Sequence, residues 1–318
     1  MATDPEGQVT PVNIGALSTL ARGNPERLRG VLCSHDVRNR VGLTGTNVHV
    51  SWLASDGSGS PLTHDLAAVL ADSVVDYCTP RTRIQEARRL DLESGENREI
   101  TRLAREAFAR FTKQESSGEG GEILLYFLME LGLGIPQILS KMSLKTSNDM
   151  HIHGVDGVYA LPVDDRGLAV YWGESKLYRS FSDAMSQCLA SIGPYLTDPW
   201  SPDRNEDMLL VRDNLDVGDR MLAIEIAEYF RSGTVQRQSI EVRGACVISF
   251  DEADYPKLGA KALAEASTEL ADRVDKWVKT IGKKIGAAQL EHVEIEFFCL
   301  PIPSVAIFRQ AFQQAIGH

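Results

Sequence analysis

The 318-residue chain is long enough for one large domain or two smaller ones, and its 43% hydrophobic content is ordinary for a protein with a packed core. Its formal net charge of -11 argues against unaided binding of nucleic acid over a broad basic surface, because phosphate contacts supply most of the affinity in such proteins. Binding of a nucleic acid would therefore require a local basic patch, metal ions or a partner protein that binds the nucleic acid.

Cysteine usage and the N-terminus indicate a cytoplasmic protein. The five cysteines are odd in number and widely spaced, which argues against a disulfide scaffold and against a zinc cluster. Residues 1–12 are polar and lack the pattern of a secretory signal, so we expect them to be disordered. No apolar run approaches the roughly 20 residues of a membrane-spanning helix, and we expect no membrane partner.

The region 13–115 is predicted to be an N-terminal α/β region. Its expected elements, in chain order, are a strand at 47–53, a helix at 63–77 that Thr63 could cap, an irregular basic stretch at 79–83 and a helix at 97–112.

The regions 116–230 and 231–318 are predicted to be a central core and a C-terminal α/β region that packs on it. The expected elements are a buried helix at 122–130, strands at 152–160 and 168–176 joined by a turn at 164–167, a helix at 179–192, a strand at 245–250, a helix at 257–281, a strand at 292–300 and a terminal helix that Ser304 could cap. The order favours a mixed α/β fold whose ends fold around the central stretch.

One face of the second central strand changes from apolar to charged along its length. Residues of equal parity share a face of a strand, so Leu168, Val170 and Trp172 lie on one side. Glu174 and Lys176 follow them on that same side. Because isolated buried charges are unfavourable, this change indicates a strand that runs out of the core into a cleft.

Two further carboxylates are predicted to point to this cleft. Asp156 shares the parity of Val158 and Ala160 on the first central strand. Glu122 opens the core-facing stripe of the preceding helix. The sequence therefore predicts a cleft that contains three carboxylates and one lysine.

These groups suit metal-dependent hydrolysis of a phosphodiester, because carboxylates around Mg²⁺, or Mn²⁺, supply charge stabilisation and an activated water. We expect Asp156 and Glu174 to bind the metal, with the backbone carbonyl of Ser175 as an extra ligand. Glu122 would reach the metal directly or through a water. Lys176 would orient or deprotonate the attacking water and stabilise the pentavalent phosphate. An amine beside two carboxylates normally keeps its proton, which favours the electrostatic role.

Asp156 followed by Glu174-Ser-Lys176 resembles the D...(D/E)xK signature of the PD-(D/E)XK nuclease superfamily, and Glu122 matches the acid often found on the preceding helix. Three segments further resemble the HamA family, the nuclease subunit of the Hachiman anti-phage system: Glu122-Ile-Leu-Leu-Tyr-Phe-Leu, His153-Gly-Val-Asp-Gly-Val and Trp172-Gly-Glu-Ser-Lys. The similarity rests mainly on residues 119–192. It implies an α/β fold with a restriction-endonuclease-like core, a mixed sheet flanked by helices, and with N- and C-terminal elaborations. It also implies a cytoplasmic effector that degrades DNA under the control of a helicase subunit.

The roles of three more polar residues stay open. Many members of the superfamily carry a glutamine, frequently with a tyrosine, on the helix after the second strand. Gln187 fits the glutamine, but Ser191 stands where the tyrosine would be. His151 and His153 could line the cleft or contribute to metal binding, although no nearby cysteine or further histidine completes a zinc site.

Two other functions also remain open. The acids could form a structural ion-pair cluster in a non-catalytic regulatory or binding subunit of a helicase complex, since exposed ion pairs contribute little by themselves. Alternatively, the chain could be a metal-dependent phosphoesterase that acts on RNA or nucleotides. The sequence does not distinguish endonuclease from exonuclease mode, and it leaves the strand preference, the activating trigger and the oligomeric state open.

Overall fold

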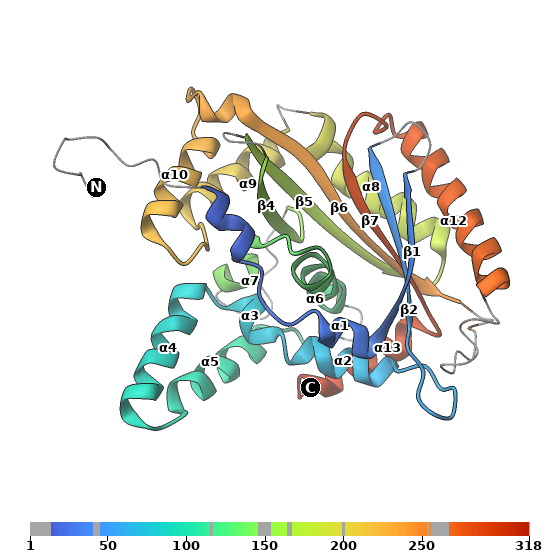
Figure 1. Cartoon of the computed structure of the whole chain (residues 1–318), viewed down its shortest axis with the longest axis horizontal. Helices are drawn as coiled ribbons and strands as arrows, with labels where there is room; N and C mark the ends of the chain where they lie inside the picture. Colours follow the sequence, from blue (N-terminus) through green and yellow to red (C-terminus); the bar gives the residue numbers. More distant parts are fainter. Residues whose placement is uncertain are drawn as a thin grey trace.

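The computed structural model describes residues 14–40, 45–114, 117–145, 154–163, 167–198, 201–252, 255 and 267–317 (Figure 1). Seven strands form one sheet in the order β1-β2-β7-β6-β5-β4-β3. The strands are β1 (Leu32–Arg40), β2 (Thr46–Leu53), β3 (Gln137–Leu139), β4 (Gly157–Val163), β5 (Gly167–Tyr178), β6 (Ile240–Asp251) and β7 (Ile295–Ile302).

The sheet is mixed, as the family resemblance implies. Strands β2, β7, β6 and β5 are parallel neighbours, whereas β1, β4 and β3 add antiparallel pairs at the two edges. The regions 13–115, 116–230 and 231–318 all contribute strands to this one sheet. The turn predicted at 164–167 and the predicted disorder of residues 1–12 fall on positions outside the described residues, apart from Gly167.

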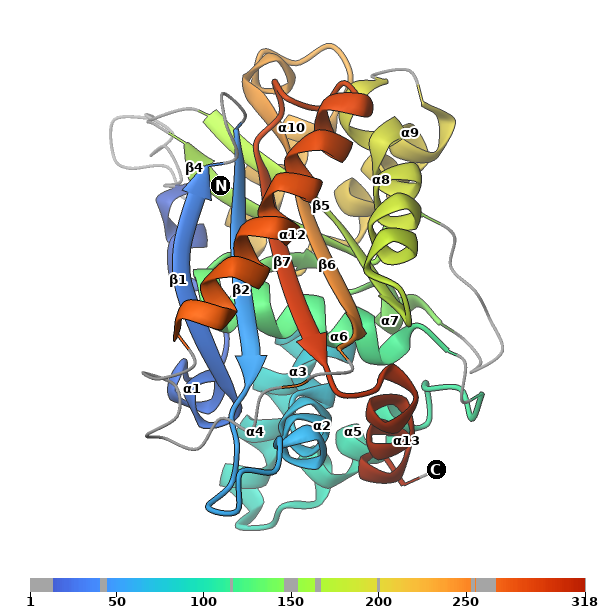
Figure 2. The ribbon, with the colours of Figure 1, turned by 90° about the vertical axis from the view of Figure 1, so that its right-hand side faces the viewer.

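Helices cover both faces of the sheet, as Figures 1 and 2 show from two directions. Helices α8, α9, α10 and α12 pack on one face, and α2, α6 and α13 pack on the other. The helices are η1 (Ile14–Thr19), α1 (Glu26–Val31), α2 (Thr63–Ala71), α3 (Val74–Cys78), α4 (Arg81–Ser94), α5 (Arg98–Phe108), α6 (Glu119–Phe127), η2 (Leu128–Gly132), α7 (Lys141–Leu144), α8 (Phe181–Thr197), α9 (Pro202–Asp213), α10 (Arg220–Phe230), η3 (Gln236–Ser239), α12 (Ser267–Ala287) and α13 (Val305–Ala315).

Strand β5 has a buried side chain toward each helical layer. Val170 and Trp172 belong to the core under α8 and α12, whereas Ala169 and Tyr171 belong to the core under α6. This alternation follows from the two-residue period of a strand. Strand β5 is therefore central, and side chains near its end can reach groups on both sides of the sheet.

The segment around residues 79–83, predicted to be irregular, is instead the start of a helix. Helix α4 begins at Arg81, directly after Pro80. A proline at this point suits a helix start, because the first amides of a helix have no intrahelical partner. The prediction for residues 63–77 was also wrong in detail, since the helix is interrupted between α2 and α3, and Leu62, not Thr63, occupies the cap position without a side-chain cap.

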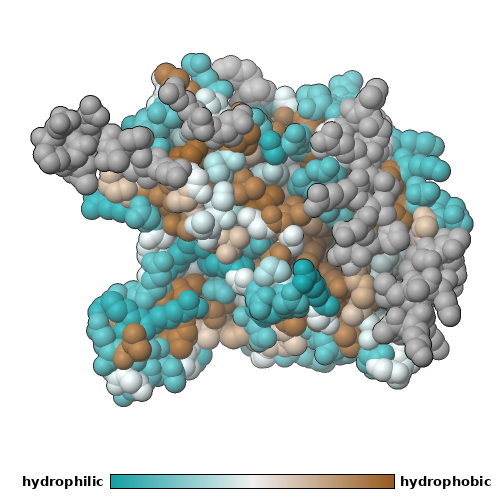
Figure 3. All heavy atoms as spheres, in the orientation of Figure 1, coloured by the Kyte–Doolittle hydropathy of each residue, from teal (hydrophilic) through white to brown (hydrophobic). Residues whose placement is uncertain are grey.

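Helices α4 and α5 form a hairpin that projects from the body (Figure 1). The space-filling view shows a hollow between this hairpin and the part of the molecule that carries α10 (Figure 3). A cavity of about 450 Å³ is lined by residues of α4 and of the segment ahead of α10. Among the described helices, none combines the length and the apolar content that crossing a bilayer requires.

Candidate active site

Asp156 lies directly before β4, and Glu174 lies on β5, one residue beyond the last β4–β5 pair. Gly157, the first residue of β4, pairs with Gly173 of β5, and the amide of Asp156 donates to the Gly173 carbonyl at 2.8 Å. Asp156 and Gly157 therefore both face Gly173, and Glu174 is the next residue along β5. The hairpin places the two acids together although 17 residues separate them in the sequence.

The carboxylate of Asp156 is held by Ser175. Its Oδ2 accepts a hydrogen bond from the Ser175 amide at 2.8 Å and another from the Ser175 hydroxyl at 2.7 Å. The amide and the carbonyl of one strand residue point to the same neighbouring strand. The Ser175 carbonyl therefore faces the side on which Asp156 lies, as a metal ligand from this residue would need to.

Glu174 is 4% exposed and lies on the face that α8 covers. Its Oε1 forms an ion pair with the ammonium of Lys176, whose side chain is 23% exposed. From α8, Ser191 hydrogen-bonds to the Glu174 carboxylate, and the Cys188 thiol lies 3.8 Å from the Glu174 carbonyl oxygen. One side of Lys176 is thus open to solvent, whereas Glu174 is enclosed by protein.

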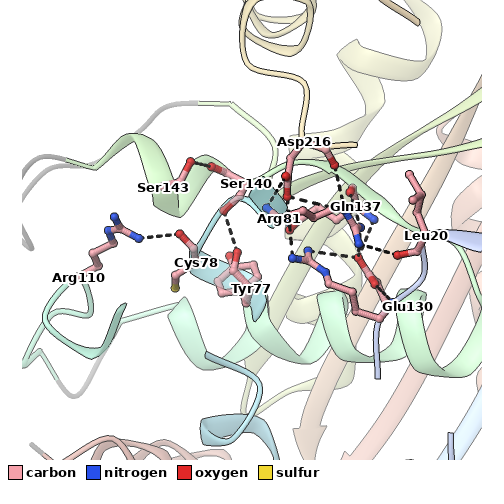
Figure 4. Close-up of polar contacts among 11 residues, drawn as sticks. Leu20, Tyr77, Cys78, Arg81, Arg110, Glu130, Gln137, Ser140, Ser143 and Asp216 are labelled. Carbon is pink, nitrogen blue, oxygen red and sulfur yellow. Dashed lines mark hydrogen bonds and ion pairs between the residues drawn. The ribbon is translucent and has the colours of Figure 1, made fainter. Parts of the chain in front are cut away.

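Glu122 approaches from the opposite layer, on α6. An added Cβ at Gly121 would lie 3.0 Å from the Ser175 hydroxyl, so the start of α6 packs directly on β5. Glu122 Oε2 accepts a hydrogen bond from the Tyr77 hydroxyl at 3.1 Å. The Tyr77 backbone carbonyl accepts in turn from Ser140 at 2.8 Å (Figure 4).

Asp156 is the carboxylate that links the two layers, and its charge acts on both other acids. Burial and then the charge of Asp156 raise the pKa of Glu122 to about 8. The same two causes raise the pKa of Glu174 to about 7. Burial also raises the pKa of Asp156, against the opposing hydrogen bond from Ser175. The site holds more negative charge than its protein groups compensate.

Lys176 keeps its proton in this environment. Burial lowers the pKa of its ammonium, but the neighbouring carboxylates of Glu174 and Asp156 outweigh this effect, and the net shift is upward. A protonated amine can stabilise negative charge and orient a water molecule, but it cannot accept a proton. This supports the electrostatic role over the base role.

The donor set has the chemistry that Mg²⁺ prefers. Within the described residues, no three His, Cys, Asp or Glu side chains are arranged close enough to hold a metal ion. Mg²⁺, however, is commonly bound by only one or two carboxylates and keeps several waters. Asp156, Glu174 and the Ser175 carbonyl offer oxygen ligands of this kind, and a cation there would offset the excess negative charge.

Sequence reasoning missed two residues that contact the predicted acids. Tyr77 comes from α3 and Ser191 from α8, and neither carries a local sequence signal of contact with a carboxylate. Gln187, whose role was left open, is exposed on α8. His151 and His153 lie outside the described residues.

The fold and the site together define an α/β protein in which a strand hairpin presents two carboxylates and a lysine at one end of a mixed sheet. A family model described as HamA matches residues 32–316, which is nearly the whole chain. The chain therefore belongs to the HamA family of the Hachiman anti-phage system, and it is a defence-related protein. No curated protein matches it.

Proposed function

We propose that the chain is a metal-dependent nuclease that hydrolyses DNA phosphodiester bonds as the effector of the Hachiman defence system. Membership of the HamA family supports the defence role. The observation that carries the catalytic part is the bonding of Asp156 to Ser175, the residue between Glu174 and Lys176, with Lys176 paired to Glu174 on the same strand. This arrangement agrees with the D...(D/E)xK likeness, in which two acids and a lysine serve one reaction.

In this proposal each group has a separate task. Asp156, Glu174 and the Ser175 carbonyl hold Mg²⁺ or Mn²⁺, which supplies polarisation of the phosphate and a more acidic bound water. Lys176 remains protonated, orients the attacking water and stabilises the extra negative charge of the transition state. Glu122, half-buried on α6, holds a water in the same site through hydrogen bonding.

The charge of the chain fits an effector that depends on a partner for its substrate. At -11, the protein as a whole repels the phosphate backbone. A helicase subunit that binds DNA would deliver the strand to the site and would control when cleavage occurs. We also propose that this complex is cytoplasmic, because the sequence indicates a cytoplasmic protein.

Cleavage by a Glu174→Gln variant tests the proposal. The complex with its helicase partner is incubated with DNA, RNA or mononucleotides, with Mg²⁺ and with chelator. We expect Mg²⁺-dependent cleavage of DNA by the native chain and a loss of more than about 100-fold in the variant, since even indirect supports of a metal contribute 10- to 100-fold. Faster cleavage of RNA or of mononucleotides than of DNA would show that DNA is not the preferred substrate.

Glu296→Gln is the matched control for this experiment. Glu296 is also a partly buried carboxylate on a strand, where the Asn47 amide and the His49 imidazole hydrogen-bond to it. We expect this variant to cleave DNA at the native rate. Equal activity of the native chain and Glu174→Gln would refute the assigned site.

A second candidate function is that of a non-catalytic regulatory subunit. It is favoured by the ion pair that already engages Glu174 and by the lack, among the described residues, of three side chains arranged to hold a metal. Calorimetric titration with Mn²⁺ separates the two functions. A nuclease should bind the ion and lose binding in Asp156→Asn, whereas a structural ion cluster has no reason to capture it.

A further inference from the structure

A buried ion pair lies under the segment that leads into Asp156. Lys141, the first residue of α7, places its ammonium 2.8 and 2.9 Å from the two carboxylate oxygens of Asp207 on α9. The side chains of Lys141 and Asp207 are 7% and 2% exposed. Neither residue belongs to the predicted site, and the two helices come from distant parts of the sequence.

The backbone just ahead of Asp156 rests directly on this pair. The Val155 amide donates to Asp207 Oδ2 at 3.2 Å. Gly154 has a φ of +106°, and an added Cβ would lie 2.4 Å from Asp207 Oδ2 and from the Lys141 ammonium. Only glycine fits both this backbone conformation and this close approach. The segment is therefore held on one side by the ion pair and on the other by the bond of Asp156 to β5.

Stability alone is a weak reason for such a pair. The desolvation of two buried charges offsets most of their attraction, so apolar residues of similar volume stabilise a fold as well or better. A charged carboxylate does, however, hold a backbone amide in a defined place, because hydrogen bonds to ionised acceptors are stronger than neutral ones. The geometry of the pair thus matches a need to fix the segment rather than to fill space.

We propose that Lys141 and Asp207 are positioning residues for Asp156 and that they set the affinity of the site for its divalent cation. This inference rests on the proposed function. Asp207 fixes the Val155 amide, and Lys141 orients the Asp207 carboxylate so that one oxygen faces that amide. Asp156 is then held in place at Ser175, where it offers its carboxylate to the cation.

The test compares Asp207→Asn with Asp216→Asn in the full chain. Asp216 is a matched control because it is buried, lies close to Arg81 and accepts the Arg81 amide at 2.7 Å, yet it belongs to a separate cluster. Calorimetry with Mn²⁺ should give about 10- to 100-fold weaker binding for Asp207→Asn and unchanged binding for Asp216→Asn. Thermal unfolding is measured for both variants, and we expect both to lose stability.

Two further measurements distinguish positioning from a general structural role. Cleavage by Asp207→Asn should recover at high Mn²⁺, as a raised apparent KM for the metal with a nearly native kcat. Gly154→Ala, which leaves both charges in place and displaces the segment, should also weaken Mn²⁺ binding.

Each outcome decides a definite point. Native Mn²⁺ affinity in both folded variants, Asp207→Asn and Gly154→Ala, would overturn the positioning role even where Asp156→Asn loses the ion, and the proposed function would then stand. If Asp156→Asn binds Mn²⁺ like the native chain, the proposed function fails and the positioning role fails with it. If Asp207→Asn does not fold, Gly154→Ala carries the test alone.

Discussion

Two clusters of buried charge in this protein differ in how their charges are balanced. In the first, drawn in Figure 4, Arg81 donates to the Glu130 carboxylate and to the carbonyls of Gln137 and Asp216. Glu130 is fully buried and also accepts from the Gln137 amide at 2.9 Å. With Arg22 beside Glu130 and Asp216, two guanidinium groups face two carboxylates. This cluster joins α4, η2 and β3 and leaves no net charge.

The second cluster contains three carboxylates and one ammonium. Lys176 pairs with Glu174, whereas Lys145 and Lys141, whose charges act on Glu122 and Asp156, are themselves paired with other carboxylates. The pKa of each of the three carboxyls is raised. A fold gains nothing from an uncompensated buried charge, and a cation in the proposed metal site would balance this excess. The comparison teaches that buried charge alone does not mark a structural ion-pair cluster, because only the first cluster balances its own charges.

The largest expected effect is a loss of stability, caused by a substitution in the balanced cluster. Glu130→Gln leaves two buried guanidinium groups against one carboxylate, and removal of one partner of a buried pair typically costs about 3–5 kcal/mol of stability. Urea unfolding should show this loss. Glu106→Gln, which removes an exposed partner of Arg83, should change stability by less than about 1 kcal/mol. Equal effects of the two variants would show that burial and balance are not what stabilises the cluster.

The next effect concerns catalysis instead of folding. Lys176→Met should lower kcat for DNA cleavage by about 10²- to 10³-fold, as the loss of one preorganised stabilising group does elsewhere. Single-turnover cleavage at saturating Mg²⁺ measures it, with thermal unfolding as the check on folding. Lys176→Arg retains a permanent charge and should recover part of the rate. An arginine variant as inactive as the methionine variant would argue for a base role, because a guanidinium does not lose its proton.

The strand that carries the candidate site, β5, could be predicted from the sequence because its pattern of apolar and charged residues is local. The alternation from Trp172 to Glu174 and Lys176 is visible within five residues, and β5 has the predicted parity. The capping of α13 by Ser304 was predicted for the same reason, since it depends on neighbouring residues. The mixed sheet was expected instead from the family resemblance. Local patterns thus placed Glu174 and Lys176 on β5, and the catalytic role of these residues stays a prediction.

Contacts made by distant segments could not be predicted in this way. Tyr77 reaches Glu122 only because α3 packs beside α6, and Asp207 reaches Val155 only through the packing of α9. Helix α4 was missed because the segment Thr79 to Arg83 looks irregular, whereas its proline in fact starts a helix. Helices α9 and α10 were also not predicted. The support of the site depends on tertiary packing, of which a single sequence shows little.

The excess charge of the site should make stability depend on pH. The pKa of Glu122 is about 8 in the folded chain and near 4.5 when exposed, so folding favours its protonated form. This contribution to stability is complete below pH 4.5 and is lost as the pH rises through about 8. Glu122→Gln should match the native chain near pH 4.5 and become about 1–3 kcal/mol more stable by pH 8, after allowance for its partial exposure.

Thermal unfolding from pH 4.5 to pH 9 without metal ions measures this effect. The exposed Glu26→Gln serves as the control, and its difference from the native chain should stay constant over the same range. If the curves of Glu122→Gln and the native chain run parallel, the charge of Glu122 is compensated in the folded state, and the contrast between the two clusters weakens.

The smallest expected effect comes from the loss of one hydrogen bond in the second cluster, the bond between Ser191 and Glu174. Ser191 donates to Glu174 and lowers the pKa of that carboxyl against the larger effect of burial. Ser191→Ala should therefore raise the pKa of Glu174 further, by roughly half a unit to one unit, since such a bond contributes about 1 kcal/mol. The acid limb of the pH–rate profile for DNA cleavage should move upward by the same amount, and the rate above pH 9 should hardly change.

Ser186→Ala alters an exposed serine of the same helix and should leave the pH–rate profile unchanged. A uniform loss of rate at every pH in Ser191→Ala would instead indicate that the serine supports the packing of α8, and that the ionisation of Glu174 does not limit the reaction.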